Sequence, residues 1–158
     1  MTPKRIGTGA AITVAALAAS GLAFAPTALA VTPQTATINA SCESLGSGAA
    51  TLTATQNGTA ATITVNSTDI KAPIALGADS IASRLTLVKA GGGTVVFSGT
   101  KNPALASGGP VTVGPLNGTV AAGDTLESFG GSLSLTVFGF ITFTCTASGP
   151  QSPGPFVF

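Results

Sequence analysis

Apolar and polar residues alternate with a period of two along much of the chain. Between residues 37 and 42, Ile38, Ala40 and Cys42 alternate with threonine, asparagine and serine. Side chains along a β-strand point alternately to the two faces of a sheet, so this pattern predicts short strands with one buried face. The same alternation recurs in six further segments: 51–55, 62–66, 84–87, 95–97, 132–137 and 141–146.

Glycine, asparagine and proline punctuate the chain between these segments. Turns are expected at positions that include 46–48, Asn57-Gly58, Gly108-Gly109-Pro110, Asn117-Gly118 and Gly130-Gly131. Seven or eight short strands joined in this way are typical of a β-sandwich or a barrel. We expect an all-β, two-sheet β-sandwich, because the strand number and the length match that fold best.

The first thirty residues have a different character. Lys4 and Arg5 precede an apolar run over residues 10–24, and the segment ends in Ala28-Leu29-Ala30. A positive start, an apolar centre and a small-x-small ending are typical of a secretory signal peptide. We predict cleavage after Ala30, a sandwich domain over residues 31–147 and a Pro/Gly-rich C-terminal tail over 148–158.

The last residues of the tail, Phe156, Val157 and Phe158, are apolar again after the Pro/Gly-rich stretch. They can fold back onto the domain or dock a partner, and the sequence leaves both open.

Two cysteines, Cys42 and Cys145, lie in the predicted mature chain. Two cysteines in an exported protein imply one disulfide. Cys42 shares the inward parity of Ile38, and Cys145 shares that of Ile141 and Phe143, so both thiols are predicted to face the core. Closing a loop of about a hundred residues stabilises a domain by roughly 4 to 5 kcal/mol in the chain-entropy model.

Cys42 also has a competing use as the lipid-modified residue of a lipoprotein. The residues before it are Asn39-Ala40-Ser41, and such a site requires an aliphatic residue where Asn39 stands. It would also leave Cys145 unpaired, so the disulfide is the preferred interpretation.

The charge of the mature chain is small and dispersed. Four of the six cations and all five anions lie beyond residue 30, which makes its net charge −1. Nucleic-acid binding needs a basic surface to neutralise phosphates, and an electrostatic hold on a membrane surface needs the same. We therefore expect no nucleic-acid partner and no electrostatic attraction to a membrane surface. We also expect no integral membrane span in the mature chain.

Most catalytic chemistry lacks the residues it needs. The chain has no histidine, and the disulfide uses both cysteines, so histidine-based catalysis, thiol nucleophiles and most zinc sites are excluded. Asp124 and Glu127 are the closest pair of acids in the sequence, and we expect both to be solvated near a Gly-rich turn. Tryptophan and tyrosine, the usual platforms for sugars, are also absent. We expect no enzyme activity, no cofactor and no metal.

The segment from Ser132 to Cys145 is the most apolar part of the mature chain. Two central core strands are the preferred interpretation, and a membrane-inserting hairpin is the alternative. The candidate contact surface consists of the phenylalanines in and around this segment and in the tail: Phe129, Phe138, Phe140, Phe156 and Phe158.

Several short motifs together indicate a family. They are Ala28-Leu29-Ala30, the early Cys42, Thr144-Cys145-Thr146, and the segments 95–99 and 111–116. With these features the chain resembles a group of small secreted actinobacterial proteins of unknown function that are predicted to be immunoglobulin-like sandwiches. The resemblance implies a fold and a location, and it brings no active site.

The sequence thus predicts a non-catalytic, secreted or cell-envelope-associated β-domain that acts by structure or protein contact. Its expected partner is a protein or envelope component, which can be a second copy of the chain. A binding module for an apolar ligand or an envelope glycan is the alternative. A self-assembling surface fibre is a further one, since uncharged edge strands invite strand addition.

Overall fold

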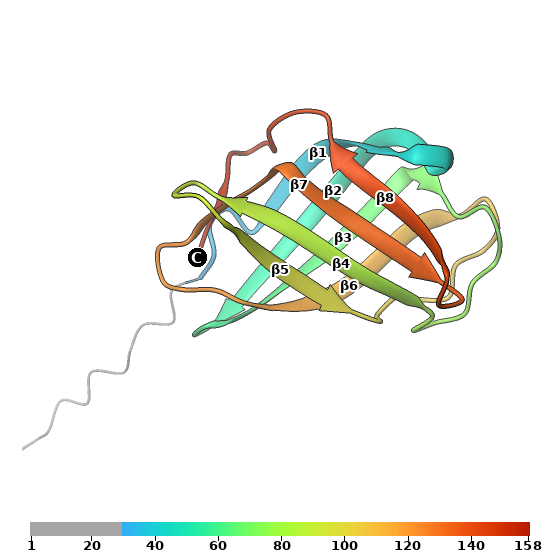
Figure 1. Ribbon diagram of the computed structural model, residues 1–158, viewed down its shortest axis with the longest axis horizontal. Coiled ribbons are helices and arrows are strands. Elements are labelled where there is room, and N and C mark those ends of the chain that lie inside the picture. The colour runs from blue at the N-terminus through green and yellow to red at the C-terminus, as the bar shows by residue number, and fades with distance from the viewer. Residues whose placement is uncertain (1–29) are drawn as a thin grey trace, which may run out of the picture.

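The computed structural model describes residues 30–158 (Figure 1). The predicted signal peptide lies outside the described residues, apart from Ala30. Within residues 30–158, no helix is long and apolar enough to cross a membrane. The elements in chain order are β1 (Thr35–Cys42), the 3-10 helix η1 (Glu43–Leu45), β2 (Gly46–Asn57), β3 (Ala60–Lys71), β4 (Ile81–Lys89), β5 (Thr94–Gly99), β6 (Pro110–Thr119), β7 (Thr125–Val137), β8 (Ile141–Ala147) and β9 (Phe156–Val157).

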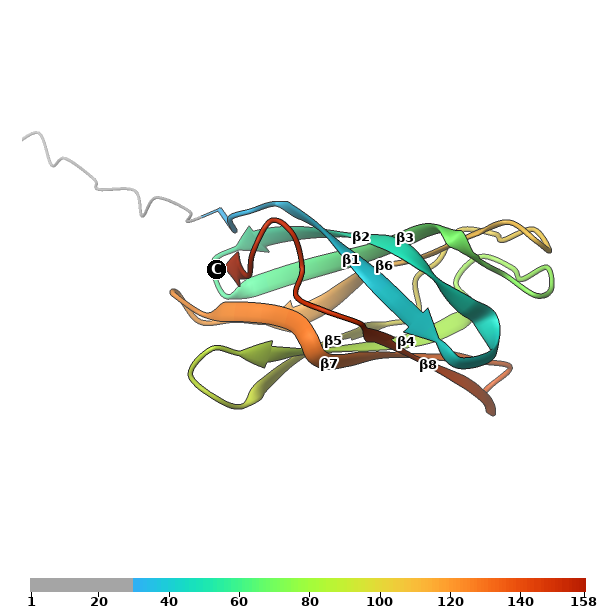
Figure 2. The ribbon, with the colours of Figure 1, turned by 90° about the horizontal axis from the view of Figure 1, so that it is seen from above.

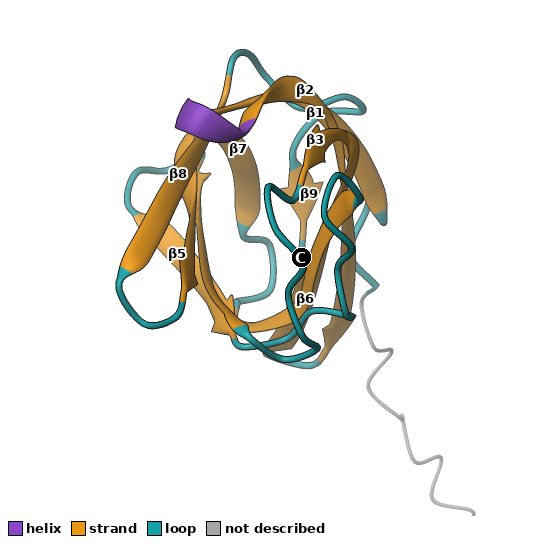
Figure 3. Cartoon of the chain, turned by 90° about the vertical axis from the view of Figure 1, so that its right-hand side faces the viewer, coloured by secondary structure: helices purple, strands orange, loops and turns teal. Residues whose placement is uncertain are grey.

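The strands form one antiparallel sheet that closes on itself. Hydrogen-bonded neighbours follow the order β4-β5-β6-β3-β2-β1-β8-β7, and β7 pairs again with β4. The result is an eight-stranded barrel, whose strands surround the interior in Figure 3. The barrel is flattened: Figure 2 shows β1, β2, β3 and β6 crossing one side, with β4, β5, β7 and β8 on the other.

The prediction of an immunoglobulin-like two-sheet sandwich is therefore wrong, although the prediction of an all-β chain is confirmed. A sandwich would leave strand edges unpaired at both sides, whereas here both sides are joined. β1 pairs with β8 through Ala40–Ala147 and Ser41–Thr146, and β5 pairs with β6 through Ser98–Asn117. The alternation in the sequence specifies only which side chains face inward, and that face is the same in a sandwich and in a barrel.

A bulge in β7 bends this strand and helps the sheet to close. The pairing of β7 with β4 jumps from Glu127 opposite Val88 to Ser132 opposite Thr86, so residues 128–131 lie opposite the single residue Leu87. A side chain at Gly131 would place its Cβ 2.0 Å from the carbonyl oxygen of Thr86, so only glycine fits there. Gly130-Gly131, predicted as a turn between strands, thus lies inside one long strand.

Asn117-Gly118 is a second predicted turn that lies inside a strand, here β6. The ring of Phe97 packs where a Cβ of Gly118 would be, with 2.5 Å between that Cβ position and the ring. The glycine is needed for close packing against an aromatic side chain, and not for a turn. The turn predicted at Asn57-Gly58 is confirmed, since it joins β2 to β3.

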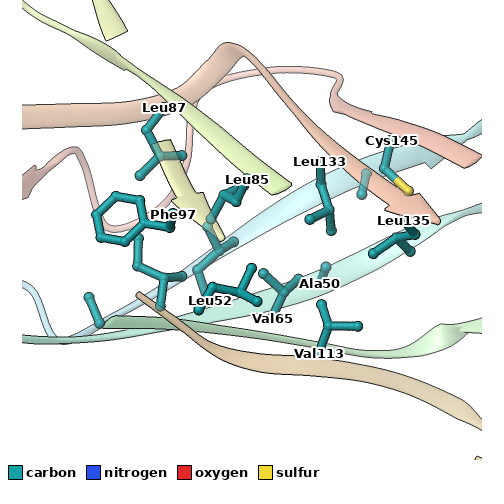
Figure 4. Packing of buried hydrophobic residues seen from close by; sticks show 14 of the residues in the cluster. Ala50, Leu52, Val65, Leu85, Leu87, Phe97, Val113, Leu133, Leu135 and Cys145 are labelled. Atoms are coloured by element: carbon teal, nitrogen blue, oxygen red, sulfur yellow. The ribbon is translucent and has the colours of Figure 1, made fainter. Parts of the chain in front are cut away.

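The core consists of the inward side chains of all eight barrel strands. Figure 4 shows Leu52, Leu85, Leu87, Phe97 and Leu135 among those that point toward one another. Leu52, Leu87 and Phe97 are fully buried. Burying a side chain of this size stabilises a fold by roughly 1.5 to 3 kcal/mol. The inward parity predicted for these strands is confirmed; Ile141 shares it, opposite Val137, but is 38% exposed.

The predicted disulfide between Cys42 and Cys145 is confirmed, and both residues are buried. Cys42 ends β1, and Cys145 lies in β8, the last full-length strand before the short β9. The β1–β8 register extended by one residue brings these two cysteines opposite each other. The disulfide therefore lengthens a junction of only two registered residue pairs with a covalent bond.

The C-terminal tail folds back onto the barrel. Thr125 and Leu126 of β7 pair with Val157 and Phe156 of β9, and Val157 also exchanges hydrogen bonds with Thr32. We call this the plugged end of the barrel, because Phe156 and Phe158 are buried there and Phe158 packs against Phe97. Figure 1 places it on the left, at the label C.

Candidate functional site: an apolar cavity at the open end

The opposite end of the barrel contains a cavity of about 220 Å³. We call it the open end; it lies on the right of Figure 1, where the β7–β8 turn and the long loops meet. All twelve residues that line the cavity are apolar: Leu45, Ala72, Pro73, Ile74, Leu76, Ile81, Leu105, Val111, Leu135, Val137, Ile141 and Phe143.

The walls come from strands and the roof from loops. Ile81, Leu135 and Val137 point inward from the ends of β4 and β7, as the alternation of those strands dictates, and they are buried. Ile74 and Ile141 also line the cavity, but they are 44% and 38% exposed. The cavity therefore reaches the protein surface at these two isoleucines.

Two loops form the roof, residues 72–80 and residues 100–109. They meet in a short antiparallel bridge in which Leu76 and Leu105 exchange backbone hydrogen bonds of 2.9 and 2.8 Å. Both leucines are buried and both line the cavity. The sequence analysis did not identify these two leucines, because neither loop has the alternation of a strand. The one signal for their burial was an apolar residue in each of two Pro-containing loops.

Asn102 holds the two roof loops together. This side chain is 4% exposed and makes four hydrogen bonds. Its Oδ1 accepts from the backbone N–H groups of Ser80 and Ile81, each at 2.9 Å, and its Nδ2 donates to the carbonyls of Gly77 and Pro103, each at 2.8 Å. All of its hydrogen-bonding groups are used, so Asn102 fixes the roof and has none left for a ligand.

An apolar rim lies beside the mouth. Phe138 and Phe140, in the turn between β7 and β8, are 59% and 78% exposed. Each is the sequence neighbour of a cavity residue, Val137 and Ile141 respectively. We call Phe138-Gly139-Phe140 the phenylalanine tip. The sequence singled out both phenylalanines as contact residues, and the structure places both in the turn whose neighbours Val137 and Ile141 line the cavity.

The other phenylalanines of the predicted contact surface lie elsewhere. Phe129 is 48% exposed and belongs to the bulge of β7, before that strand pairs with β8. Phe156 and Phe158 are buried in the plugged end, so they contribute packing and offer no exposed ring. The question that the sequence left open about the tail is answered by this docking.

Charged groups contribute no chemistry to the cavity. The ion pair between Lys101 and Asp79, at 3.0 Å, is exposed on the outside of the roof loops. Within the described part of the chain, no group of three or more histidine, cysteine, aspartate or glutamate side chains is arranged to hold a metal ion.

The two acids that we expected to be solvated, Asp124 and Glu127, are engaged instead. Asp124 accepts from the backbone N–H of Ala121 and forms a 2.8 Å ion pair with Lys89. These two contacts, the backbone hydrogen bond first, hold the pKa of Asp124 below its ordinary value. One carboxylate oxygen of Glu127 accepts from the backbone N–H groups of residues 128, 129 and 151. Both acids therefore stabilise the plugged half of the barrel.

A smaller void of about 40 Å³ lies deeper in the barrel, beside the disulfide. Val111 and Leu135 line both it and the larger cavity, so the two spaces share a wall. The small residues Ala40, Ala50 and Gly131 leave this room in the centre of the core. The interior is therefore loosely filled from its centre to the open end, whereas two phenylalanines, Phe156 and Phe158, are buried at the plugged end.

Comparisons with models of protein families, with curated protein sequences and with solved structures give no match, so the function has to be argued from this geometry.

Proposed function

We propose that the protein is a non-catalytic binding module for a small, uncharged apolar molecule, which it holds in the cavity at the open end. The observation that supports this is a space of about 220 Å³ whose lining has no polar residue. The prediction of an exported domain is kept as part of this proposal, because a buried disulfide fits an oxidising location.

The size of the cavity suits an aromatic molecule or a short aliphatic one. An apolar cavity of about 150 Å³ lined by leucine, isoleucine and phenylalanine stays dry and binds benzene. At roughly 24 cal/mol per Å³, leaving this larger cavity empty costs about 5 kcal/mol relative to a filled core. For a domain with a total stability of about 5 to 15 kcal/mol this is a large loss, and a ligand that fills the space recovers it.

The same lining disfavours a glycan ligand. Sugar hydroxyls lose their hydrogen bonds to water on entry, and the cavity wall offers no side-chain partner for them. Closure of the barrel also leaves a fibre less strand edge to use, because β1 pairs with β8 and β5 with β6 over part of their lengths.

Binding of a neutral apolar dye tests the proposal. N-phenyl-1-naphthylamine fluoresces when it enters an apolar site, so a titration of the folded protein gives its dissociation constant. Substituting Ala72→Leu places three extra carbons in the cavity and should weaken dye binding at least about tenfold. Ala82→Leu, on the exposed face of β4, is the matched control and should leave the affinity unchanged.

Two results would overturn the proposal. One is a parent protein that binds neither the dye nor benzene, and the other is equal binding by the Ala72→Leu variant and the parent. If the dye binds and Ala72→Leu weakens its binding, solvent extraction of the protein purified from its native source, followed by mass spectrometry, would identify the class of the natural ligand.

A further inference from the structure

The phenylalanine tip is the most exposed apolar feature at the mouth of the cavity. Phe138 and Phe140 are exposed by more than half of their surface, and the cavity-lining Ile74 and Ile141 continue this apolar area toward the mouth. In Figure 1 the β7–β8 turn lies at the lower right, at the same end of the barrel as the two roof loops. The tip is thus an exposed hairpin turn next to the mouth of the cavity.

Phe138 occupies a position that its side chain disfavours. The backbone N–H of Phe140 donates to the carbonyl of Val137 at 3.3 Å, which closes a tight turn, and φ is +53° at Phe138 and +77° at Gly139. Two consecutive positive φ values are typical of the two-residue hairpin turn in which Asn-Gly is the preferred pair. A bulky residue with positive φ is an outlier, so an exposed aromatic ring is present where asparagine would fold better.

The charges around the open end are few and of both signs. Glu43, Asp69, Lys71, Asp79 and Lys101 lie in its loops and strand ends, and they sum to −1. No charged residue occurs anywhere from Ser128 to Phe158, the segment that contains the tip. A surface of this kind has no net positive charge to attract an anionic membrane, so its partition into lipid depends on apolar burial.

We infer that the phenylalanine tip inserts into the surface of a lipid bilayer, and that the cavity exchanges its apolar ligand with the membrane there. The second half of this inference rests on the proposed function, whereas the first half does not. The tip buries Phe138 and Phe140 among acyl chains while the barrel stays outside, so the mouth at Ile74 and Ile141 faces the lipid.

A lipid surface fits the tip better than a protein partner does. Protein interfaces have their strongest contacts at tryptophan, tyrosine and arginine, surrounded by a polar rim that forms hydrogen bonds. The tip has none of these residues, and Lys101 and Asp79 at the same end already pair with each other. Two exposed, uncharged phenylalanines can be buried in the acyl-chain region of a bilayer, which offers an apolar environment and requires no complementary shape.

Flotation with phosphatidylcholine vesicles tests this inference on the mature protein without ligand. Phe138→Asn removes an inserting ring and also supplies the residue that the turn prefers, so the variant should fold. It should lower vesicle binding at least about tenfold while leaving the dye affinity in lipid-free buffer unchanged. Phe129→Ser, an exposed phenylalanine remote from the tip, should leave vesicle binding unchanged.

The outcomes separate this inference from the proposed function. Equal vesicle binding by parent and Phe138→Asn overturns insertion of the tip, and so does binding that requires anionic phosphatidylglycerol. A dimer in sedimentation that Phe138→Asn abolishes would assign the tip to a second copy and also overturns it. Vesicle binding through the tip by a protein that binds no dye would support insertion and contradict only the cavity proposal.

Discussion

The apolar interior of the barrel is covered differently at its two ends. At the plugged end, Phe156 and Phe158 fill the interior, and Phe158 packs against Phe97 of β5. At the open end, Leu76 and Leu105 cover the interior from two loops and leave about 220 Å³ unfilled. Both ends have many apolar side chains, so their number does not explain the difference. The ends differ in the size of these side chains and in the segments that carry them: phenylalanines of the tail at one end, leucines of two loops at the other.

The ion pairs of the two ends show the same contrast. Lys89–Asp124 near the plugged end is 2.8 Å long, and the aspartate side chain is 14% exposed. Lys101–Asp79 at the open end is 3.0 Å long, but its aspartate is 54% exposed. Exposed pairs contribute about 0 to 1 kcal/mol. We therefore expect the ion pair at the plugged end to contribute more to stability than the one at the open end.

Replacing Cys42 and Cys145 together with alanine should give the largest loss of stability. The disulfide closes a loop with a sequence separation of 103 residues, for which the expected loss is about 4 to 5 kcal/mol. Denaturant unfolding of variant and parent measures it. Hydrogen exchange should rise first in β1, β8 and η1, which meet near the open end. A loss below about 1 kcal/mol would show that strand pairing alone holds this junction.

Phe156→Ala should destabilise the protein by about 4 kcal/mol, because it leaves a void at the plugged end. Thermal and denaturant unfolding measure the effect. Val157→Ala is the matched control in the same strand, and it should change stability little because Val157 is 45% exposed. If the two variants were equally stable, the tail would not be a plug.

Asn102→Ala should cost about 2 to 3 kcal/mol, because the N–H groups of Ser80 and Ile81 lose their acceptor in a buried setting. Their amide exchange rates report the loss directly, and dye affinity should fall as the roof loosens. Ser107→Ala removes an exposed contact between the same loops, to the carbonyl of Pro73, and should have a much smaller effect. Unchanged exchange at Ser80 and Ile81 would contradict the role of Asn102.

Asp124→Asn should cost about 1 kcal/mol at neutral pH, through its contacts to Ala121 and Lys89. The folded state lowers the pKa of this carboxyl below 3.8, so its contribution is complete above about pH 4 and disappears as the pH falls through the folded value. The stability curves of variant and parent should therefore converge in acid. Asp79→Asn, at the open end, should cost less, and curves that stay parallel down to pH 2 would refute the assignment.

Phe138→Asn should give the smallest change in stability, a gain of about 0.5 to 1 kcal/mol, because asparagine tolerates the positive φ of this turn. Thermal unfolding measures it. Phe140→Asn, one residue beyond the glycine, relieves no positive φ and should give no gain. A loss of stability in Phe138→Asn would mean that the ring packs on the barrel and is not held out for a partner.

Much of this molecule follows from its alternating pattern. The strands with their buried faces, the absence of α-helices over residues 30–158 and the inward direction of both cysteines are all local consequences of a period of two. The disulfide followed from that parity and from the number of cysteines. Phe138 and Phe140 are candidate contact residues from the sequence because they are phenylalanines within the most apolar segment of the mature chain, residues 132–145.

The errors have a common cause, since they concern contacts between segments distant in the sequence. Gly131 resembles a turn residue, and only its approach to Thr86 shows that it permits a bulge. Gly118 resembles one too, and only the ring of Phe97 explains it. Asn102 is an ordinary loop asparagine until four backbone groups from two loops meet it.

The sequence by itself determined that this chain forms antiparallel strands around one apolar interior, closed by a disulfide between its first and last full-length strands. Only the tertiary structure decided that the sheet closes into a barrel, that the tail fills one end and that the other end keeps a cavity. The reason is physical: alternation records which side of a strand is buried. Closure and cavity volume depend instead on which strand edges meet and on how completely distant side chains fill the space between them.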